Sequence, residues 1–388
     1  MTTGQPRRAW MVPFFANTVL VQVITFVLRP VAIYRAIELD VPLHWLGALG
    51  ASFAVVPLLL AVSAGHATDR FGERRVMGVG AGLNLMATLA FSAFGSTVWG
   101  LLVASVTLGM GHLASVVAQQ ALVANRVETT RYDTAFGHYT FAASAGQAVG
   151  PGLIVLFGGT GAIPNTGQIF EWSVVTAVLL GLSVVALPHR PPASDAGGEP
   201  GSIRGLLRRK GLVRALTVSS VVLAAVDISL VYLPVLGTER DISAGVIGGL
   251  LAIRAIASMG SRLFLGRLAA WLGRGRLLTT SIAISALGMA LLPIPMPLWL
   301  LGIVVAGTGL GLGAGQPLTM SWLAEATPPG LRGRAMSLRL TGNRLGQVII
   351  PSAAGLVAVG GGAGGVLWLT AGALALVGLA SRSIPRST

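Results

Sequence analysis

The stretch GHATDRFGERR, residues 65 to 75, concentrates charge in a chain that is only 10% charged, and it has a second copy in GRLAAWLGRGR, residues 266 to 276. The two copies lie 201 residues apart (266 − 65 = 201). They share both glycines and the final arginine, whereas Asp69 and Arg70 have no counterpart in the second copy. A polar stretch repeated once within an apolar chain predicts a turn between two apolar segments in each half of a duplicated protein.

The same offset recurs elsewhere in the chain. It places Gly47 on Gly248 and Arg131 on Arg332, and with one residue of slippage it places GQAVGP (146–151) on GQVIIP (346–351). Matches at nearly one offset, each at the same place in its half, indicate a duplication. Two parallel six-helix repeats around a central cavity are a recurring design of transporters.

Composition indicates a membrane protein. Of the 388 residues, 53% are hydrophobic, the mean hydropathy is +0.78, and 10% are charged, against about 25% in soluble domains. The absence of cysteine excludes disulfides, thiolate metal sites and cysteine nucleophiles. No nucleotide-binding loop, metal-ligand cluster or nucleophile–base set is evident, so neither a catalytic site nor a metal or cofactor is expected. The net charge of +14 lies in short loops between apolar segments, and nucleic acid is therefore not an expected partner.

Segments long enough to cross a bilayer follow one another along the chain. We predict an all-α membrane protein with twelve transmembrane helices in two pseudo-symmetric six-helix bundles. The predicted spans are 10–36, 44–66, 75–95, 98–123, 133–158, 168–187, 212–236, 243–265, 276–294, 298–322, 334–358 and 364–381. The stretch 188–211, rich in Pro, Gly and charge, predicts a cytoplasmic linker between an N-terminal bundle (1–187) and a C-terminal bundle (212–388).

The positions of the basic residues predict the orientation. Most of the 27 Lys and Arg residues fall in segments that are cytoplasmic if the N-terminus is cytoplasmic. The positive-inside rule then puts both termini in the cytoplasm, which requires an even number of spans. We expect a multi-pass protein of the plasma (inner) membrane, with membrane lipids around it, and no cleavable signal peptide is evident.

The first polar stretch resembles the loop between spans 2 and 3 of the major facilitator superfamily of secondary transporters. Members of the family carry Gly-x-Leu-Ala-Asp-Arg-x-Gly-Arg-Lys or a close variant there. The residues that match are Gly65, Asp69, Arg70, Gly72, Arg74 and Arg75, while Ala67 and Glu73 depart from the pattern. The resemblance covers essentially the whole chain, and it implies a monomeric carrier, bacterial and of the drug or metabolite efflux type, for a small molecule and protons.

The resemblance also implies a role for this motif at an inner gate. From its chemistry, Asp69 can accept hydrogen bonds from a helix N-terminus or pair with an arginine of the other half. Gly65 allows helix 2 to end close against a neighbour, and Gly72 supplies the dihedral angles of a tight turn. The alternative is a basic turn that only sets topology. Because the second copy has lost Asp69, we expect the acid to be needed in one half only.

Span 5 carries GQAVGPGLIVLFGG. Gly146, Gly150 and Pro151 match the pattern of drug–proton antiporters in the family, but Ile154 and Val155 stand where the last glycines belong. The partial match makes export the first choice of direction. The alternative is a Gly-Pro kink that serves only close helix packing.

Polar and ionisable side chains within spans are costly in lipid and point to a transport path. The candidates for the substrate or proton path are Arg29, Asp227, Arg254, Arg344, His112, Gln119, Gln316 and Glu325. By resemblance, spans 1, 4, 7 and 10 line the cavity, so Arg29 and Asp227 can pair across it. Asp227 is the carboxylate placed deepest in a span and the first candidate proton carrier; Glu325 is the second. The alternative is a static ion pair.

Arginine outnumbers aspartate among these side chains, which favours an anionic or amphiphilic solute. The alternative is that some arginines bind helix carbonyls or extend to an interface, above all Arg339. Three functions therefore stay open. The first is a proton-coupled exporter of a small organic compound, the second an importer or facilitator of an anionic metabolite, and the third a non-transporting receptor or scaffold.

Overall fold

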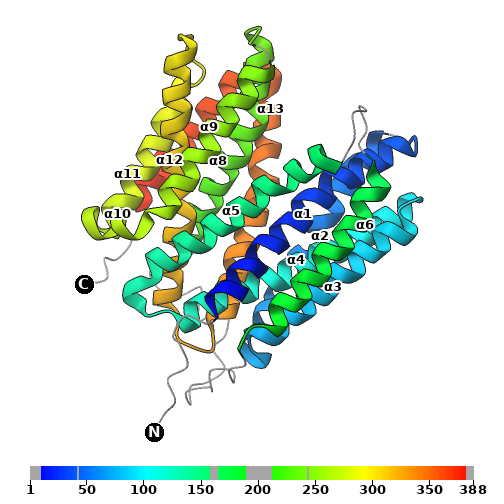
Figure 1. Cartoon of the computed structure of the whole chain (residues 1–388). Helices are drawn as coiled ribbons and strands as arrows, with labels where there is room; N and C mark the ends of the chain where they lie inside the picture. Colours follow the sequence, from blue (N-terminus) through cyan, green and yellow to red (C-terminus); the bar gives the residue numbers. More distant parts are fainter. Residues whose placement is uncertain (1–9, 42, 158–164, 189–211, 243, 382–388) are drawn as a thin grey trace. The chain divides into compact units, whose positions relative to one another are not determined.

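The computed structural model describes residues 10–41, 43–157, 165–188, 212–242 and 244–381, which form helices and turns and contain no strand. Each predicted span overlaps a helix, so the predicted all-α fold is confirmed. Residues 189–211, nearly all of the predicted linker, lie outside the described part. The helices of Figure 1 are α1 (Met11–Glu38), α2 (Leu43–Phe71), α3 (Glu73–Phe94), α4 (Val98–Arg126), η1 (Thr129–Arg131), α5 (Tyr132–Phe157), α6 (Thr166–Val185), α8 (Leu212–Glu239), α9 (Ala244–Leu263), α10 (Leu265–Leu272), α11 (Arg274–Leu291), α12 (Leu298–Ala326) and α13 (Arg332–Ser381).

Several of these helices are long and apolar enough to cross a membrane. Within the described residues there are seven, or eight if α9 and α10, which are bent by 64° at their junction, count as one span. The seven segments are Met11–Glu38, Ser52–Phe71, Glu73–Phe94, Val98–Arg126, Thr166–Val185, Leu298–Ala326 and Gly361–Leu379. Together with the fold, they make the chain a multi-pass membrane protein.

The backbone repeats at the same offset as the sequence. Gly72 and Gly273 (273 − 72 = 201) have φ angles of 86° and 76°. Asp40 and Asp241 (241 − 40 = 201) have φ angles of 51° and 54°, and they are the non-glycine residues with positive φ in the described part. Positive φ angles are uncommon, above all for residues with a Cβ such as aspartate. One glycine pair and one aspartate pair with positive φ at the same offset therefore show that the turns of the two halves have the same geometry.

The turn at the opening stretch is shorter than predicted. The expectation that helix 2 ends at Gly65 is wrong, because α2 continues to Phe71 and only Gly72 leaves the helical conformation. No residue between them breaks a helix, whereas the backbone of Gly72 (φ 86°, ψ 154°) is accessible essentially to glycine alone. In the second copy, Gly273 separates α10 from α11 in the same way.

The helices group into two compact units. The first contains Met1–Asn125, Ala142–Gly197 and Pro329–Ser337, and the second contains Arg126–Phe141, Gly198–Pro328 and Leu338–Thr388. The units follow the two halves of the sequence except at the beginnings of α5 and α13, each of which packs with helices of the other half. The domain boundaries predicted at the linker stay a prediction.

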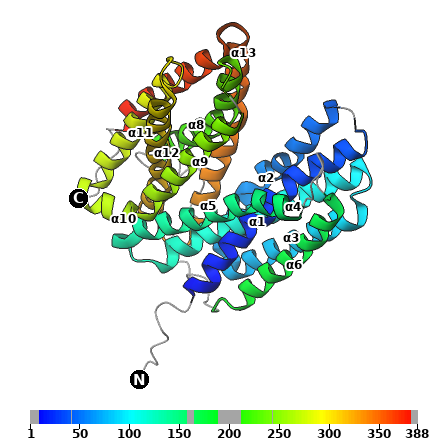
Figure 2. The ribbon, with the colours of Figure 1, turned by 45° about the horizontal axis from the view of Figure 1, so that its top comes forward.

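In the first unit, α6 packs against α1 and α3 (Figure 2). A buried chain of hydrogen bonds links three helices: Gln119 on α4 donates to Asn17 on α1 at 2.8 Å, and Asn17 donates to Ser183 on α6 at 2.9 Å. Such bonds hold transmembrane helices together where lipid offers no other partner. The predicted path residue Gln119 therefore has a structural contact within its own unit.

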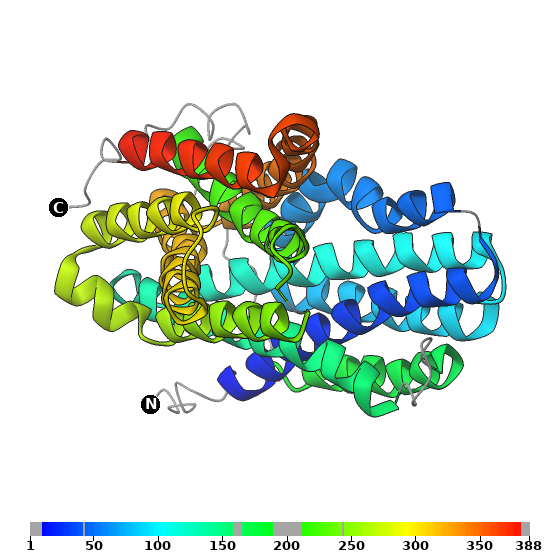
Figure 3. The same cartoon turned by 90° about the horizontal axis from the view of Figure 1, so that it is seen from above.

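In the second unit, α12 packs against α8, α9 and α11. Gly362 breaks α13 with a φ of 58°, and the amide of the next residue, Ala363, donates to the Glu239 carboxylate at 2.9 Å. The part of α13 that follows lies beside α11 (Figure 3), where Trp368 Nε1 donates to Ala290 O at 3.0 Å. The predicted spans 11 and 12 thus correspond to the two helical parts of α13, which meet at Gly362.

Candidate functional site

Asp69 lies near the end of α2 and faces the beginning of α13, within the first unit. The amide of Gly333 donates to Asp69 Oδ1 at 2.7 Å, and the amide of Arg334 donates to Oδ2 at 3.1 Å. The Arg334 guanidinium is 3.6 Å from Oδ2, and the Asp69 side chain is only 5% exposed. The first amides of a helix have no partner in the helix and carry partial positive charge. Asp69 therefore caps a helix that comes from the other half of the sequence.

Two glycines allow this contact. A Cβ on Gly65 would lie 2.7 Å from Gly333 O, and a Cβ on Gly333 would lie 2.6 Å from Gly65 O. Real Cβ atoms essentially never approach an oxygen so closely, so neither position accommodates a side chain without moving α2 from α13. The role predicted for Gly65, close approach to a neighbour, applies within α2 and not at its end.

The arginines of the stretch point elsewhere. Arg74 donates to the carbonyls of Val184 and Val185 at 3.3 and 3.0 Å, where its charge complements the C-terminal end of α6. Arg70 lies over the ring of the neighbouring phenylalanine, 5.3 Å from its centre, and Arg75 is exposed. Among these side chains, Asp69 is thus the one that binds α13, and the arginines serve the surface and the end of α6.

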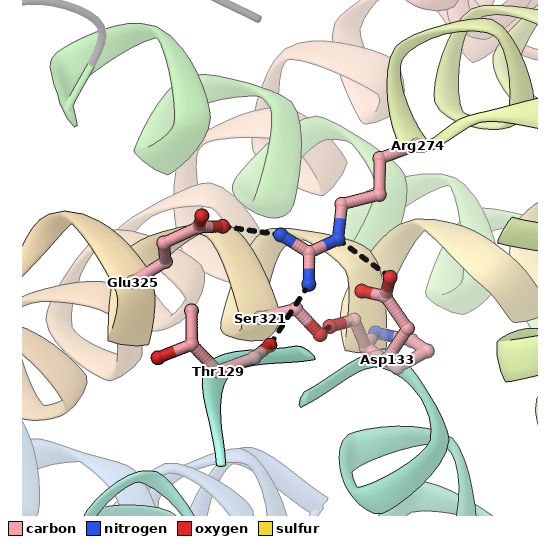
Figure 4. A network of polar contacts seen from close by, with 6 residues as sticks. Thr129, Asp133, Arg274, Ser321 and Glu325 are labelled. Carbon is pink, nitrogen blue, oxygen red and sulfur yellow. Dashed lines mark hydrogen bonds and ion pairs between the residues drawn. The ribbon is translucent and has the colours of Figure 1, made fainter. Parts of the chain in front are cut away.

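The second unit has a charged cluster at the corresponding turn (Figure 4). Arg274, the first residue of α11, donates through Nε to Asp133 Oδ2 at 2.5 Å, pairs through Nη1 with Glu325, and donates through Nη2 to Thr129 O at 3.3 Å. Burial alone would lower the pKa of Arg274, but the hydrogen bonds and charges of Asp133 and Glu325 raise it. Arg274 therefore holds together the beginnings of α5 and α11 and the end of α12.

The acid and the arginine of the two ion pairs, Asp69–Arg334 and Asp133–Arg274, occupy opposite places in the two units. At the offset of 201, Arg274 corresponds to Glu73 and Arg334 corresponds to Asp133. In the first unit the acid, Asp69, lies on the turn and the arginine at the start of α13. In the second unit the arginine lies on the turn and the acid at the start of α5. The second copy of the turn carries no acid of its own, and its arginine binds Asp133, which comes from the first half of the sequence. That an acid is needed in one copy only stays a prediction.

The predicted path residues lie in different surroundings. Glu325 pairs with Arg274 near the end of α12. Asp227 on α8 lies close enough to Arg254 on α9 for their opposite charges to attract, and Arg254 is buried. Arg344 is half-buried on α13. Pairing between Arg29 and Asp227 stays a prediction.

Arg339 is deeply buried. The alternative that it extends to an interface is wrong, since it is 2% exposed and donates to Gln316 Oε1 at 2.9 Å and to Ser219 Oγ at 3.3 Å. Ser219 in turn donates to Asn343 Oδ1 at 2.9 Å. The predicted path residue Gln316 thus belongs to a polar network that joins α8, α12 and α13 in the second unit.

A second cluster lies in the first unit around Phe53 on α2. The guanidinium of Arg29 on α1 lies 4.5 Å from the centre of the Phe53 ring, and the His112 ring on α4 lies 5.6 Å from it. Thr25 Oγ1 is 3.0 Å from His112 Nδ1. Two predicted path residues, Arg29 and His112, therefore flank one aromatic ring.

The glycines of span 5 pack α5 closely against α1. A Cβ on Gly146 would lie 2.8 Å from Gln22 Cβ, and a Cβ on Gly150 would lie 3.0 Å from Phe26 Cβ. The side chain of Pro151 lies outside the described part of the chain. Helix packing accounts for both glycines without reference to a direction of transport.

Sequence reasoning missed several residues of these sites, among them Asp133, Arg334, Phe53 and Thr25. The repeat held a signal for the first two, because the offset of 201 aligns them with opposite charges. Phe53 and Thr25 gave no signal, since each is an ordinary residue of an apolar span. Among the described residues, no group of three or more His, Asp or Glu side chains could hold a metal ion.

The sequence matches the model of the Major Facilitator Superfamily over residues 14–307 and 215–387. Comparison with curated proteins gives no match. Similar solved structures include the human organic anion transporter MFSD10 (TETRAN), with 17% identity, a TM-score of 0.82, and coverage of 97% of this chain and 100% of that one. The E. coli fucose:proton symporter FucP has 13% identity, a TM-score of 0.82, and coverage of 98% and 100%. A bacterial homologue of the iron transporter ferroportin has 14% identity, a TM-score of 0.78, and coverage of 97% and 98%. At these identities the likeness shows the fold alone.

Proposed function

Because the chain belongs to the Major Facilitator Superfamily, we propose that it is a secondary active transporter that moves a small organic solute by alternating access and couples this movement to protons. The family and the fold support a secondary transporter, and the coupling, the solute and the cycle are the proposal. We place the protein in the plasma (inner) membrane as a monomer, with both termini in the cytoplasm.

The observation that carries the proposal is the pair of polar contacts at matching turns of the repeat. Asp69 binds the start of α13, and Arg274 binds Asp133 at the start of α5. Each contact joins helices from opposite halves of the sequence, and each consists of hydrogen bonds and charges that can break while the helices stay folded. Contacts of this kind suit a gate that opens and closes in each transport cycle.

For the coupling proton, the proposal assigns Asp227. Its charge attracts the buried Arg254, and protonation of the carboxylate would remove that attraction. A change of partner linked to protonation is one way to couple a proton to a conformational step. Asp227→Asn is therefore expected to abolish transport driven by a pH gradient while leaving solute exchange, which needs no net proton movement, largely intact.

The experiment uses the purified full chain. A thermal-shift screen of small organic compounds selects ligands, and counterflow in proteoliposomes then tests whether the hits are transported. A pH gradient imposed in either direction gives the mode of coupling. Solute that accumulates inside the vesicles while protons flow out indicates proton antiport, which suits export. Solute that accumulates while protons flow in indicates proton symport, which suits import. If no ligand is exchanged, the chain is a receptor or scaffold and the transporter proposal fails.

A second candidate is import or facilitated diffusion of an organic anion. The observation that favours it is the number of arginines within the spans, notably Arg29 beside Phe53 and the buried Arg254. Counterflow with matched anionic and neutral solutes at a single pH separates it from the first candidate, because a facilitator exchanges the anion without any response to the pH gradient.

A further inference from the structure

We infer that Arg29 and His112, both in contact with the Phe53 ring, form a binding site for an organic carboxylate, and that His112 takes up a proton when this anion binds. The inference rests on the proposed transport function only in treating the anion as the transported solute. It names the substrate class of the proposed proton-coupled transporter, an organic anion that is accompanied by a proton.

Arg29 supplies the charge for the anion. Its guanidinium lies 4.5 Å from the centre of the Phe53 ring, within the range of a cation–π contact. Stacking on the ring uses the face of the guanidinium. The N–H groups point outward in the plane of the guanidinium, where their spacing matches the two oxygens of a carboxylate. Arg29 is exposed, whereas Phe53 is buried, so the ring supports the arginine from behind. Pro30 has no amide proton for the preceding turn, which loosens α1 next to Arg29.

The hydrogen bonds of Thr25 determine which nitrogen of His112 carries a proton. Thr25 Oγ1 lies 2.9 Å from Val21 O, and because a carbonyl cannot donate, the single hydroxyl proton is used there. The same oxygen is 3.0 Å from His112 Nδ1, so in that contact the ring N–H is the donor. Neutral His112 therefore has its proton on Nδ1, and Nε2 is the nitrogen that accepts a second proton.

Few other ionisable groups lie on the helices around His112. Besides Arg29, α1 carries Tyr34, Arg35 and Glu38 near its outer end, where Arg35 pairs with Glu38. Residues 49–65 of α2, 76–94 of α3 and 142–157 of α5 contain no ionisable side chain, and His112 is the one within residues 98–125 of α4. The charge that His112 meets on these segments is therefore mainly that of Arg29.

This arrangement couples the anion to the proton. A protonated His112 and Arg29 are two cations beside the same ring, and their repulsion opposes protonation. A bound carboxylate offsets that repulsion, so anion binding favours protonation, and by linkage protonation strengthens anion binding. The proton comes from water and forms the Nε2–H bond. On release of the anion that bond breaks and the proton returns to water, so one proton accompanies each monovalent anion.

The exposed Arg29 indicates which ligands the site prefers. Because the Phe53 side chain is buried, its ring holds the guanidinium in place, and the carboxylate of a ligand contacts the guanidinium itself. We therefore expect aromatic carboxylates to bind better than neutral compounds of the same shape.

The test measures binding to the purified full chain by calorimetry, with benzoate and 2-naphthoate as probes and benzamide and 2-naphthamide as neutral analogues. A charge-assisted hydrogen bond predicts that the carboxylates bind about 10- to 100-fold more tightly than the amides. Binding should be tighter at about pH 5.5 than at about pH 8, with net proton uptake. Arg29→Gln should abolish the preference for carboxylates, and His112→Gln should abolish the pH dependence. Arg29→Lys, which keeps the charge but not the planar group, should retain part of the preference.

The matched control is Arg267→Gln. Arg267 is also an exposed arginine beside a phenylalanine, with its guanidinium 5.9 Å from the Phe264 ring, but it lies on α10 in the second unit. This variant removes the same charge and should leave carboxylate binding and its pH dependence unchanged.

Two results overturn the inference: carboxylates that bind no better than their amides, or an unchanged pH dependence in His112→Gln. Counterflow separates this failure from failure of the transporter proposal. Carboxylates that bind as expected but are not exchanged leave the binding site standing and remove the transport function. If other solutes are exchanged but carboxylates do not bind, the transport function stands and the carboxylate site is removed.

Discussion

Substitution of Asp69 by asparagine tests the contact between α2 and α13 most directly. The carboxylate accepts two amide hydrogen bonds, from Gly333 and Arg334, and lies 3.6 Å from the Arg334 guanidinium. Asparagine has nearly the same shape but no charge and one acceptor oxygen. If that oxygen keeps the bond to one amide, the side-chain NH₂ faces the other amide, and two donors meet.

The magnitude follows from the bonds lost. A hydrogen bond to a charged group contributes about 1.5–3 kcal/mol, and a neutral one about 1 kcal/mol. The substitution removes one charge-assisted bond and weakens the other. Because the Asp69 side chain is only 5% exposed, water recovers little of the loss. We expect the contact to lose about 2–3 kcal/mol, which corresponds to an increase of about 30- to 150-fold in the ratio of open to closed contact.

The assay uses the absence of cysteine from the chain. Ser337 is fully buried where α13 meets Gly65, so a thiol introduced by Ser337→Cys reacts with a maleimide only when the contact opens. Where closing is fast relative to labelling, the labelling rate is proportional to the open fraction. Asp69→Asn in this background should therefore raise the labelling rate about 30- to 150-fold.

The control is Asp40→Asn, which removes a carboxylate from an exposed turn whose positive φ asparagine also tolerates. It should leave the labelling rate unchanged. An equal labelling rate for Asp69→Asn and its parent would refute the argument, because it would mean that the carboxylate does not hold α13 in place.

Three further predictions concern stability and packing. Gly65→Ala should raise labelling of the thiol at position 337, because a Cβ there collides with the backbone of α13; Gly82→Ala, where a Cβ meets nothing within 4 Å, is its control. Arg274→Gln leaves two partly buried carboxylates without their cation and should lower the free energy of unfolding by about 2 kcal/mol, measured by thermal unfolding in detergent. Gly72→Ala forces a Cβ into a backbone conformation with φ 86° and should lower stability by about 1–3 kcal/mol. The same assay should show a much smaller change for Gly275→Ala, and equal effects of these two substitutions would contradict the assignment of strain to Gly72.

Much of the candidate site could be read from the chain before its fold was known. The motif identified Asp69 as an acceptor for a helix N-terminus, and the offset of 201 located the matching turn around Gly273. These predictions succeed because the backbone geometry of a turn glycine is set locally, and because a carboxylate accepts hydrogen bonds whichever helix it meets, although the sequence does not name that helix.

Other assignments failed or were missing for the opposite reason. An interface was one position that the sequence left open for Arg339, but Gln316 and Ser219 hold it in the interior. The partner of Arg274 could not be named, because Asp133 is 141 residues away in the sequence. Spacing along a helix indicates which face a side chain occupies, but not which other helix meets that face.

The sequence by itself determined that this is an all-α membrane protein with a duplicated architecture, because hydropathy and the repeat are properties of the chain alone. Only the tertiary structure decided that Asp69 binds the start of α13, that Arg274 binds Asp133, and that His112 and Arg29 share the ring of Phe53. Those arrangements depend on contacts between helices far apart in the sequence. The opening stretch shows both levels: its glycines follow from backbone geometry, whereas the role of Asp69 depends on the helix that it meets.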